Sequence, residues 1–273
     1  MDLSPFRLVW IDYHEGRVSA KEFLNDLGLI DVSRPLLIHS SFRSLKPWGA
    51  DPKVWVTELA DLFAESGLLI PTFTGRREDG PLDPPQFDPE TTESWTGVIP
   101  ETARKHFGPD ARSLHPTHSF LCLGGAAGWK EGHETCLTPC GPGSPLVRLA
   151  KEKGQILLAG CGLESLTLVH AAEEAAEAPY VLQSEPVRCN VKMLDEWRQT
   201  DPIHLHSWET PRAYEKLEPR LREAGLLESK DMKGFCFSVI QAGPTLDLLT
   251  EWIRTDPACV LPDLHPGDLT HIH

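Results

Sequence analysis

Five short apolar runs divide this chain, and each has the length and composition of a buried β-strand. They are rich in Leu, Ile and Val and are bounded by Gly, Pro or Ser, which is typical of strands covered on both faces. We therefore predict strands at 35–41, 67–74, 119–124, 155–161 and 236–242.

Helix start signals lie between and after these runs. Asp51, Ser144 and Thr210 are each followed by proline, which pairs a capping residue with a proline at the first helical position. The predicted helices span 52–65, 145–153 and 211–224. Strands that alternate with helices predict a single α/β domain over residues 1–273, with a predominantly parallel sheet covered by helices on both faces.

Composition and charge narrow the function. The chain has 273 residues, of which 40% are hydrophobic and 24% charged, as in an ordinary globular protein. The formal net charge of −14 argues against nucleic acid as a partner, because such binders are basic. It favours cationic ligands, although solubility alone also accounts for it. No apolar run reaches the roughly 18 residues of a membrane span. We therefore expect a cytoplasmic protein with no membrane partner, whose seven cysteines are reduced.

One long irregular segment stands out at residues 75–94. It is rich in Pro, Asp and Gly and shows little apolar periodicity. A loop of this length inside a compact domain is more often functional than idle. We interpret it as a candidate lid or acceptor-binding loop.

Polar groups gather where predicted strands end. The run 39–45 follows the first strand and contains serines and Arg43, and the run 112–116 joins Arg112 to Ser113 and His115. Hydroxyls, guanidinium groups and free backbone N–H groups on such turns bind phosphate or a polar cofactor arm. Ligands of parallel sheets also collect at the carboxyl ends of the strands.

The run 167–174 carries a candidate base. His170 precedes Glu173 and Glu174 by three and four residues, so on a helix either carboxylate can orient the imidazole. An imidazole with a pKa near 6.5 suits proton removal at neutral pH. The alternative is a buried structural histidine beside an acidic stripe of exposed helix residues.

These pieces, taken in order, resemble a known family. The matching segments are His39-Ser40-Ser41-Phe42-Arg43-Ser44, Leu69-Ile70-Pro71-Thr72, Phe87-Asp88-Pro89 with Thr96-Gly97, Arg112-Ser113 with His115-Pro116-Thr117-His118-Ser119, Gly143-Ser144-Pro145-Leu146, Leu157-Leu158-Ala159-Gly160, Thr167 with His170 and Glu173, and Pro179-Tyr180. Their order and spacing resemble the aminoglycoside 3-N-acetyltransferases, whose fold is unrelated to the GCN5-like group. The resemblance covers residues 20–180, and the last third matches loosely.

The resemblance implies acetyl-CoA as donor and acetylation of a primary amine in a ternary complex. The 3-amino group of an aminoglycoside is the first choice of acceptor. His170 is the implied general base, and Glu173 is its implied partner. The chain has Gly49-Ala50, Gly67-Leu68 and Leu166 where the family usually has a Gly pair, Gly-Thr and Asn. These differences bear on the acceptor rather than on the donor.

The resemblance also sorts the remaining candidates. We expect the pantetheine and phosphate groups of the donor to contact Ser40, Ser41, Arg43, Thr72, Arg112, Ser113 and His115. A polycationic acceptor needs convergent carboxylates. The candidates for this role are Glu78, Asp79, Asp83, Asp88 and Glu209. The alternative for these acidic residues is an ordinary hydrophilic loop.

Three rival functions stay open at this point. One is the same chemistry on a different amine, and the second is a CoA-binding protein without turnover. The third is a metal-dependent hydrolase, since the chain offers Cys136, Cys140, His204, His206, His265, His271 and His273. These residues are scattered and lack the paired spacing of a zinc site, so we expect no metal. A homodimer is one candidate for the oligomeric state.

Overall fold

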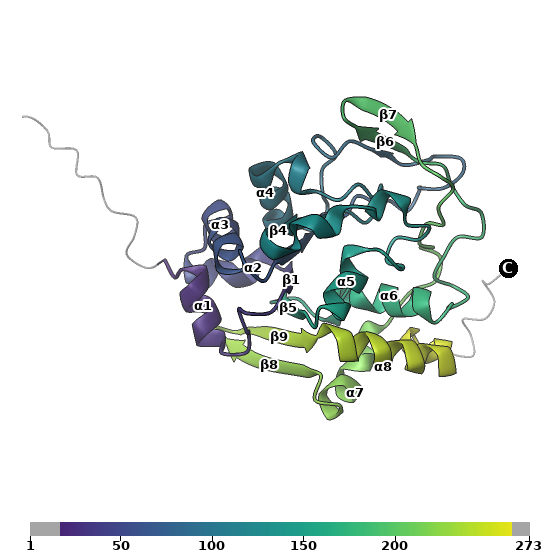
Figure 1. The fold of residues 1–273 in the computed structure, drawn as a ribbon. Helices are drawn as coiled ribbons and strands as arrows, with labels where there is room; N and C mark the ends of the chain where they lie inside the picture. The colour runs from purple at the N-terminus through teal and green to yellow at the C-terminus, as the bar shows by residue number, and fades with distance from the viewer. Residues whose placement is uncertain (1–16, 264–273) are drawn as a thin grey trace, which may run out of the picture.

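A six-stranded sheet forms the centre of the computed structural model, which describes residues 17–263 (Figure 1). Its strands are β1 (Leu36–Ser40), β2 (Leu68–Pro71), β4 (Phe120–Leu123), β5 (Gln155–Ala159), β8 (Leu227–Met232) and β9 (Phe235–Gln241). All five predicted strands are present, and β8 is additional. The strands lie in the order β4-β2-β1-β5-β9-β8.

Strand direction changes from the centre of the sheet to its edges. β1 pairs in parallel with both β2 and β5, whereas β2–β4, β5–β9 and β8–β9 are antiparallel pairs. The predicted α/β class with parallel strands at its centre is therefore confirmed. The sheet as a whole is mixed, because its outer pairs run antiparallel.

Helices cover both faces of this sheet. They are α1 (Ala20–Leu27), α2 (Phe42–Leu45), α3 (Pro52–Leu62), α4 (Val98–Phe107), α5 (Pro145–Lys151), α6 (Leu168–Ala175), α7 (Glu218–Glu223) and α8 (Ala242–Thr255). Successive strand residues point to opposite faces. Leu37 and Ile156 share a core with α5, α6 and α8, whereas Leu36 and Leu157 share a core with α1, α3 and α4. The prediction of helices on both faces is confirmed.

Two of the three predicted helix starts are confirmed. The Asp51 side chain accepts a hydrogen bond from the Val54 N–H at the start of α3, and Ser144 caps α5 in the same way. The helix predicted from Thr210 is wrong at its start, because the Ala213 N–H donates to the Val260 carbonyl, far along the chain. Helical structure begins only with a 3₁₀ turn at Tyr214–Leu217, which leads into α7.

A small second sheet lies across the molecule from β8 and β9 (Figure 1). It contains β3 (Gln86–Phe87), β6 (Asn190–Met193) and β7 (Glu196–Gln199) in the order β3-β6-β7. β6 and β7 form a hairpin whose turn residues, Leu194 and Asp195, both have positive φ. β3 belongs to the irregular segment 75–94, so this segment is anchored to the hairpin.

Two expectations about the chain as a whole concern membranes and thiols. Among residues 17–263, no helix combines the length and the hydropathy that a membrane span requires. All seven cysteines lie within this range, and they are free thiols. Four of them are buried and only Cys236 is exposed, in line with the expected reduced state.

Candidate active site

A cavity of about 410 Å³ opens at the carboxyl ends of β1 and β2. His39 and Ser40 line it from β1, while Pro71 and Phe73 line it from the end of β2. The first turn of α6 and the segment 206–214 close the other side. Ligand sites of open α/β sheets lie at this edge, so the cavity is the natural place for chemistry.

The first turn of α6 places His170 in the cavity wall. The helix begins after Thr167, whose hydroxyl lies 3.2 Å from His39 Nε2 and ties the helix start to β1. His170 Nδ1 lies 2.8 Å from Glu173 Oε2, and the His170 side chain is 27% exposed. The spacing of three residues brings the two groups together as predicted. If Nδ1–H donates to the carboxylate, Nε2 is the free basic atom of the imidazole.

Glu173 is fully buried and is held from three sides. Tyr214 donates its hydroxyl to Oε2 at 3.0 Å, and Arg212 Nε donates to Oε1 at 3.3 Å. Burial alone raises the pKa of this carboxyl, but the hydrogen bond from His170 and the charges of His170 and Arg212 outweigh burial and lower it. The carboxylate is therefore ionised at neutral pH and can stabilise a protonated His170.

The end of β1 supplies a second group of polar atoms. The Ser40 hydroxyl is buried against the cavity and has no hydrogen-bond partner within the described part of the chain. Ser41 begins α2, and its N–H donates to the Ala159 carbonyl at 2.9 Å. Arg43 is exposed on α2. Ser40 lines the cavity, whereas Ser41 and Arg43 lie beside it.

Thr72 and Arg112 lie behind the cavity wall. Arg112 Nε donates to Thr72 Oγ1 and to Ser119 Oγ, at 3.2 and 3.0 Å. Its Nη atoms donate to the carbonyls of Thr72, Pro89 and Thr92. Arg112 is 1% exposed, and burial lowers its pKa to about 9. This guanidinium ties residues 89–92 to the end of β2, and the expected contact of Arg112 and Thr72 with the donor stays a prediction.

Ser113 and His115 are likewise internal. Ser113 Oγ accepts from the Phe120 N–H at 2.8 Å and lies 2.8 Å from His133 Nδ1. His115 Nδ1 accepts from the His118 N–H at 3.2 Å, and both Ser113 and His115 are completely buried. Neither lines the cavity, and their contact with the donor stays a prediction.

The predicted acceptor carboxylates do not converge on the cavity: Asp79 and Asp83 both bind the Arg76 guanidinium, and Asp88 binds Lys192. Asp79 is buried, and its carboxylate accepts hydrogen bonds from Arg76. The Arg76 backbone N–H donates at 2.7 Å, and the Arg76 guanidinium donates at 3.0 and 3.1 Å. Glu78 and Glu209 are exposed and lie outside the cavity lining. Within residues 17–263, Glu164 is the one carboxylate among the residues that line the cavity.

Two tryptophans lie at the cavity, although nothing in the sequence pattern indicated that they belong to the site. Trp95 and Trp208 are 57% and 45% exposed, and their rings meet edge to face with centroids 6.4 Å apart. Trp95 Nε1 donates to the Gly75 carbonyl at 2.9 Å. Trp95, which directly follows the irregular segment 75–94, therefore lines the cavity and is hydrogen-bonded to the first residue of that segment. Such a pair can hold the apolar face of a ligand.

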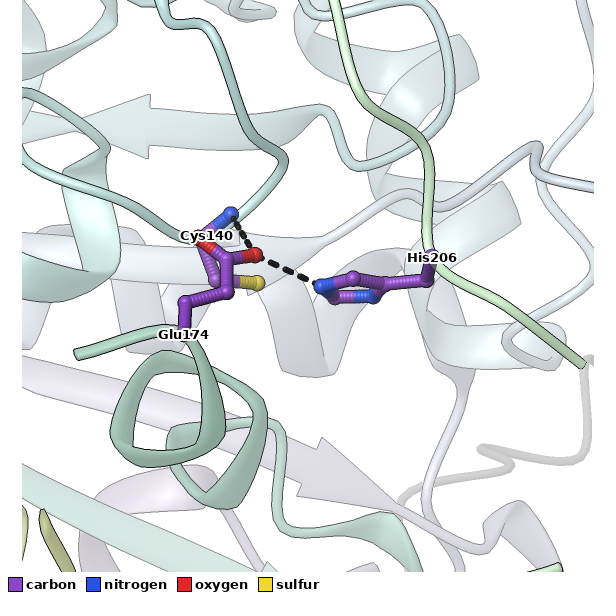
Figure 2. A group of neighbouring side chains, drawn as sticks. All are labelled: Cys140, Glu174 and His206. Atoms are coloured by element: carbon purple, nitrogen blue, oxygen red, sulfur yellow. Dashed lines mark hydrogen bonds and ion pairs between the residues drawn. The ribbon is translucent and has the colours of Figure 1, made fainter. Parts of the chain in front are cut away.

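A third cluster contains residues that the sequence suggested for a metal. Cys140, Glu174 and His206 offer ligand atoms within 4.8 Å of one another (Figure 2). Of the other candidates, His204 Nδ1 lies 3.0 Å from the Gln183 carbonyl, and Cys136 Sγ contacts backbone carbonyls. His265, His271 and His273 lie outside the described residues.

Comparison with known proteins fits this geometry. The model of the aminoglycoside 3-N-acetyltransferase family matches residues 37–254. Aminoglycoside N(3)-acetyltransferase VIII of Streptomyces fradiae is 38% identical over 206 residues, covering 67% of this chain and 71% of the relative. The apoenzyme structure of aminoglycoside acetyltransferase AAC(3)-IVa has a TM-score of 0.70 at 26% identity, covering 93% of this chain and 94% of its own.

A second solved structure, AAC-IIIb in a binary complex with CoASH, has a TM-score of 0.72 at 20% identity, covering 91% of this chain and 99% of its own. At that identity the likeness concerns the fold alone. The family model covers well over half of the chain, and the matching motifs include the His170–Glu173 pair at the cavity. This chain therefore belongs to the aminoglycoside 3-N-acetyltransferase family.

Proposed function

We propose that this protein transfers the acetyl group of acetyl-CoA to a primary amine, with the 3-amino group of an aminoglycoside as acceptor. The observation that carries the proposal is the His170–Glu173 pair at the carboxyl edge of the sheet. Family membership adds the donor and the acceptor class.

The pair suits proton removal during amine attack. The amine nitrogen attacks the thioester carbonyl carbon, and His170 Nε2 takes a proton from that nitrogen as the new C–N bond forms. The C–S bond then breaks, and the CoA thiolate takes the proton from the imidazolium. Glu173 stabilises the charged imidazole between these steps, while Tyr214 and Arg212 fix the carboxylate.

Ser40, Ser41 and Arg43 remain the proposed donor-binding group. Ser40 lines the cavity with an unpartnered hydroxyl that suits the amide groups of pantetheine, while the exposed Arg43 suits a phosphate. Thr72, Arg112, Ser113 and His115 support the wall behind them. A cytoplasmic location, where acetyl-CoA is available, is part of this proposal.

Release of CoA thiol tests the proposal. The purified protein should release thiol from acetyl-CoA when it is given an aminoglycoside, and the product should carry one added acetyl group. His170→Ala should lower turnover by about 10²- to 10⁴-fold at saturating donor and acceptor. Turnover within about tenfold of wild type would remove the base role from His170.

The cavity also supports a second acceptor class. Within the described part of the chain, Glu164 is the single carboxylate among its lining residues, and Trp95 and Trp208 offer aromatic faces. An amine with fewer positive charges and an apolar body fits these groups. A panel that includes small aromatic and alicyclic amines beside aminoglycosides decides between the two classes by the ratio of their kcat/KM values.

A further inference from the structure

A second histidine shares the cavity with His170. His206 Nε2 lies 2.6 Å from Glu174 Oε1, and the same oxygen accepts from the Cys140 N–H at 2.9 Å (Figure 2). Glu174 directly follows Glu173 on α6. Neighbouring carboxylates on one helix thus each hold a different histidine.

The His206 ring is placed to meet the same substrate as His170. Both rings line the cavity, and their centroids are 4.8 Å apart with a tilt of 41°. With Nε2 bound to Glu174, Nδ1 of His206 has no hydrogen-bond partner among residues 17–263. The titratable and charged groups around this ring are His118, Cys140, His170, Glu173, Glu174 and Arg212.

The proposed reaction requires the removal of a further proton from the acceptor nitrogen, for which the His170–Glu173 pair does not account. An amine acceptor is mostly protonated at neutral pH, so its nitrogen must lose two protons to become an amide. The second proton passes through His170 to the CoA thiolate. The first must leave before attack, because an ammonium nitrogen has no free electron pair.

We propose that His206, held by Glu174, is a second base that takes the first proton from the bound ammonium group and so prepares the amine for attack. The inference rests on the proposed acetylation. His206 Nδ1 accepts the proton, and Nε2 passes its own proton to Glu174, so that imidazole changes tautomer and the carboxylate becomes a neutral acid. After the product leaves, Glu174 returns its proton to Nε2 and Nδ1 gives its proton to water, which restores the starting tautomer and the carboxylate.

The electrostatics of the pair suit this relay. Burial and the nearby charge of His170 lower the pKa of His206 well below its ordinary value, so its imidazole is neutral and can accept a proton. Burial raises the pKa of Glu174 to about 7, against lowering by its hydrogen bonds with Thr138 and the Cys140 N–H. Glu174 can therefore hold the relayed proton near neutral pH.

The pH dependence of kcat/KM separates this role from a structural one. At a pH well below the pKa of the acceptor amine, His206→Gln and Glu174→Gln should each lower kcat/KM by about 10²-fold. The loss should shrink as the pH approaches that pKa, because free amine then reaches the site unaided. His170→Gln should instead lower kcat at every pH. Glu177→Gln is the matched control, since Glu177 is an exposed carboxylate just after the same helix, and it should keep the wild-type profile.

Three results would overturn the proposal. The first is an equal loss at all pH values in the two variants, and the second is no loss in either of them. The third is one equivalent of bound zinc in the purified protein that Cys140→Ser removes, because Cys140, Glu174 and His206 would then be metal ligands.

Nitrogen-15 spectra of the histidine rings test the pair without turnover. They should show His206 protonated at Nε2 and bare at Nδ1 in the wild type, with that preference weakened in Glu174→Gln. A proton on Nδ1 in the wild type would contradict the relay. If no amine promotes thiol release, the proposed function fails, whereas these spectra still decide the state of the pair.

Discussion

Removing the charge of Glu173 while keeping its shape is the sharpest test of the site. Its carboxylate accepts from His170, Tyr214 and Arg212, and Glu173 is fully buried. A glutamine can accept at one of its two positions only. Its amide nitrogen must therefore face either Arg212 or the pair formed by His170 and Tyr214. Glu173→Gln removes the negative charge that stabilises a protonated imidazole in either case.

The magnitudes follow from these contacts. A hydrogen bond to a charged group contributes about 1.5–3 kcal/mol, and about 1.4 kcal/mol is a tenfold change in rate, so kcat should fall about 10- to 100-fold. Arg212 loses its ionic partner but keeps hydrogen bonds to the carbonyls of Ser207 and Tyr180. Breaking this largely buried pair should therefore cost about 3 kcal/mol, at the low end of the usual range, and lower Tm by roughly 6 °C.

Initial rates of thiol release give kcat and KM, and calorimetry gives Tm. KM for both substrates should change little, because Glu173 acts through His170 and does not line the cavity. Glu177→Gln is the control, since Glu177 is an exposed carboxylate just after the same helix. A folded Glu173→Gln protein with wild-type kcat would refute the reasoning.

Three further predictions concern the framework. Burial raises the pKa of Glu174 to about 7 in the folded protein. Its favourable contribution to the unfolding free energy is therefore complete below about pH 4.5 and is lost as the pH rises through about 7. Relative to Glu174→Gln, the unfolding free energy measured in urea should fall by up to about 3 kcal/mol across that window. Arg112→Lys should lower the unfolding free energy by about 3–5 kcal/mol while leaving KM for acetyl-CoA unchanged, because one ammonium cannot replace a guanidinium that donates to three carbonyls. Gly160→Ala should cost at least about 2 kcal/mol by urea denaturation, since φ is +67° and the new Cβ would lie 2.1 Å from Ser44 Cβ; Gly225→Ala, with the same φ and open space, should cost less.

The elements that could be predicted are those whose signal is local. The five strands followed from apolar runs, and the His170–Glu173 pair followed from helix periodicity. The strand β8 was missed because its sequence, LESKDM, is mostly polar, as suits the edge of a sheet. The start of the helix predicted at Thr210 failed because a contact between Ala213 and Val260 overrides the capping signal.

The internal contacts of Arg112 were not predictable, because they depend on chemistry that looks alike in a sequence. A guanidinium on a turn uses the same N–H groups to bind a phosphate or backbone carbonyls. Only the position of residues 89–92 in the structure shows that Arg112 binds carbonyls. Arg212 and Tyr214 were missed for the opposite reason. They reach Glu173 from about forty residues away, in a segment with no motif of its own.

The distribution of charge separates attraction of the acceptor from its selection. A net charge of −14 draws any cationic amine toward the molecule. Protein charges more than a Debye length of about 8 Å from the ligand respond to its total charge and do not distinguish its shape. Discrimination among amines therefore depends on the groups in contact with the ligand. Among the residues that line the cavity, the groups that can do this are Glu164, the Trp95 and Trp208 faces, and the imidazoles of His170 and His206. Under the proposed mechanism, such a site admits many cations and acetylates those whose amine reaches both His170 and His206.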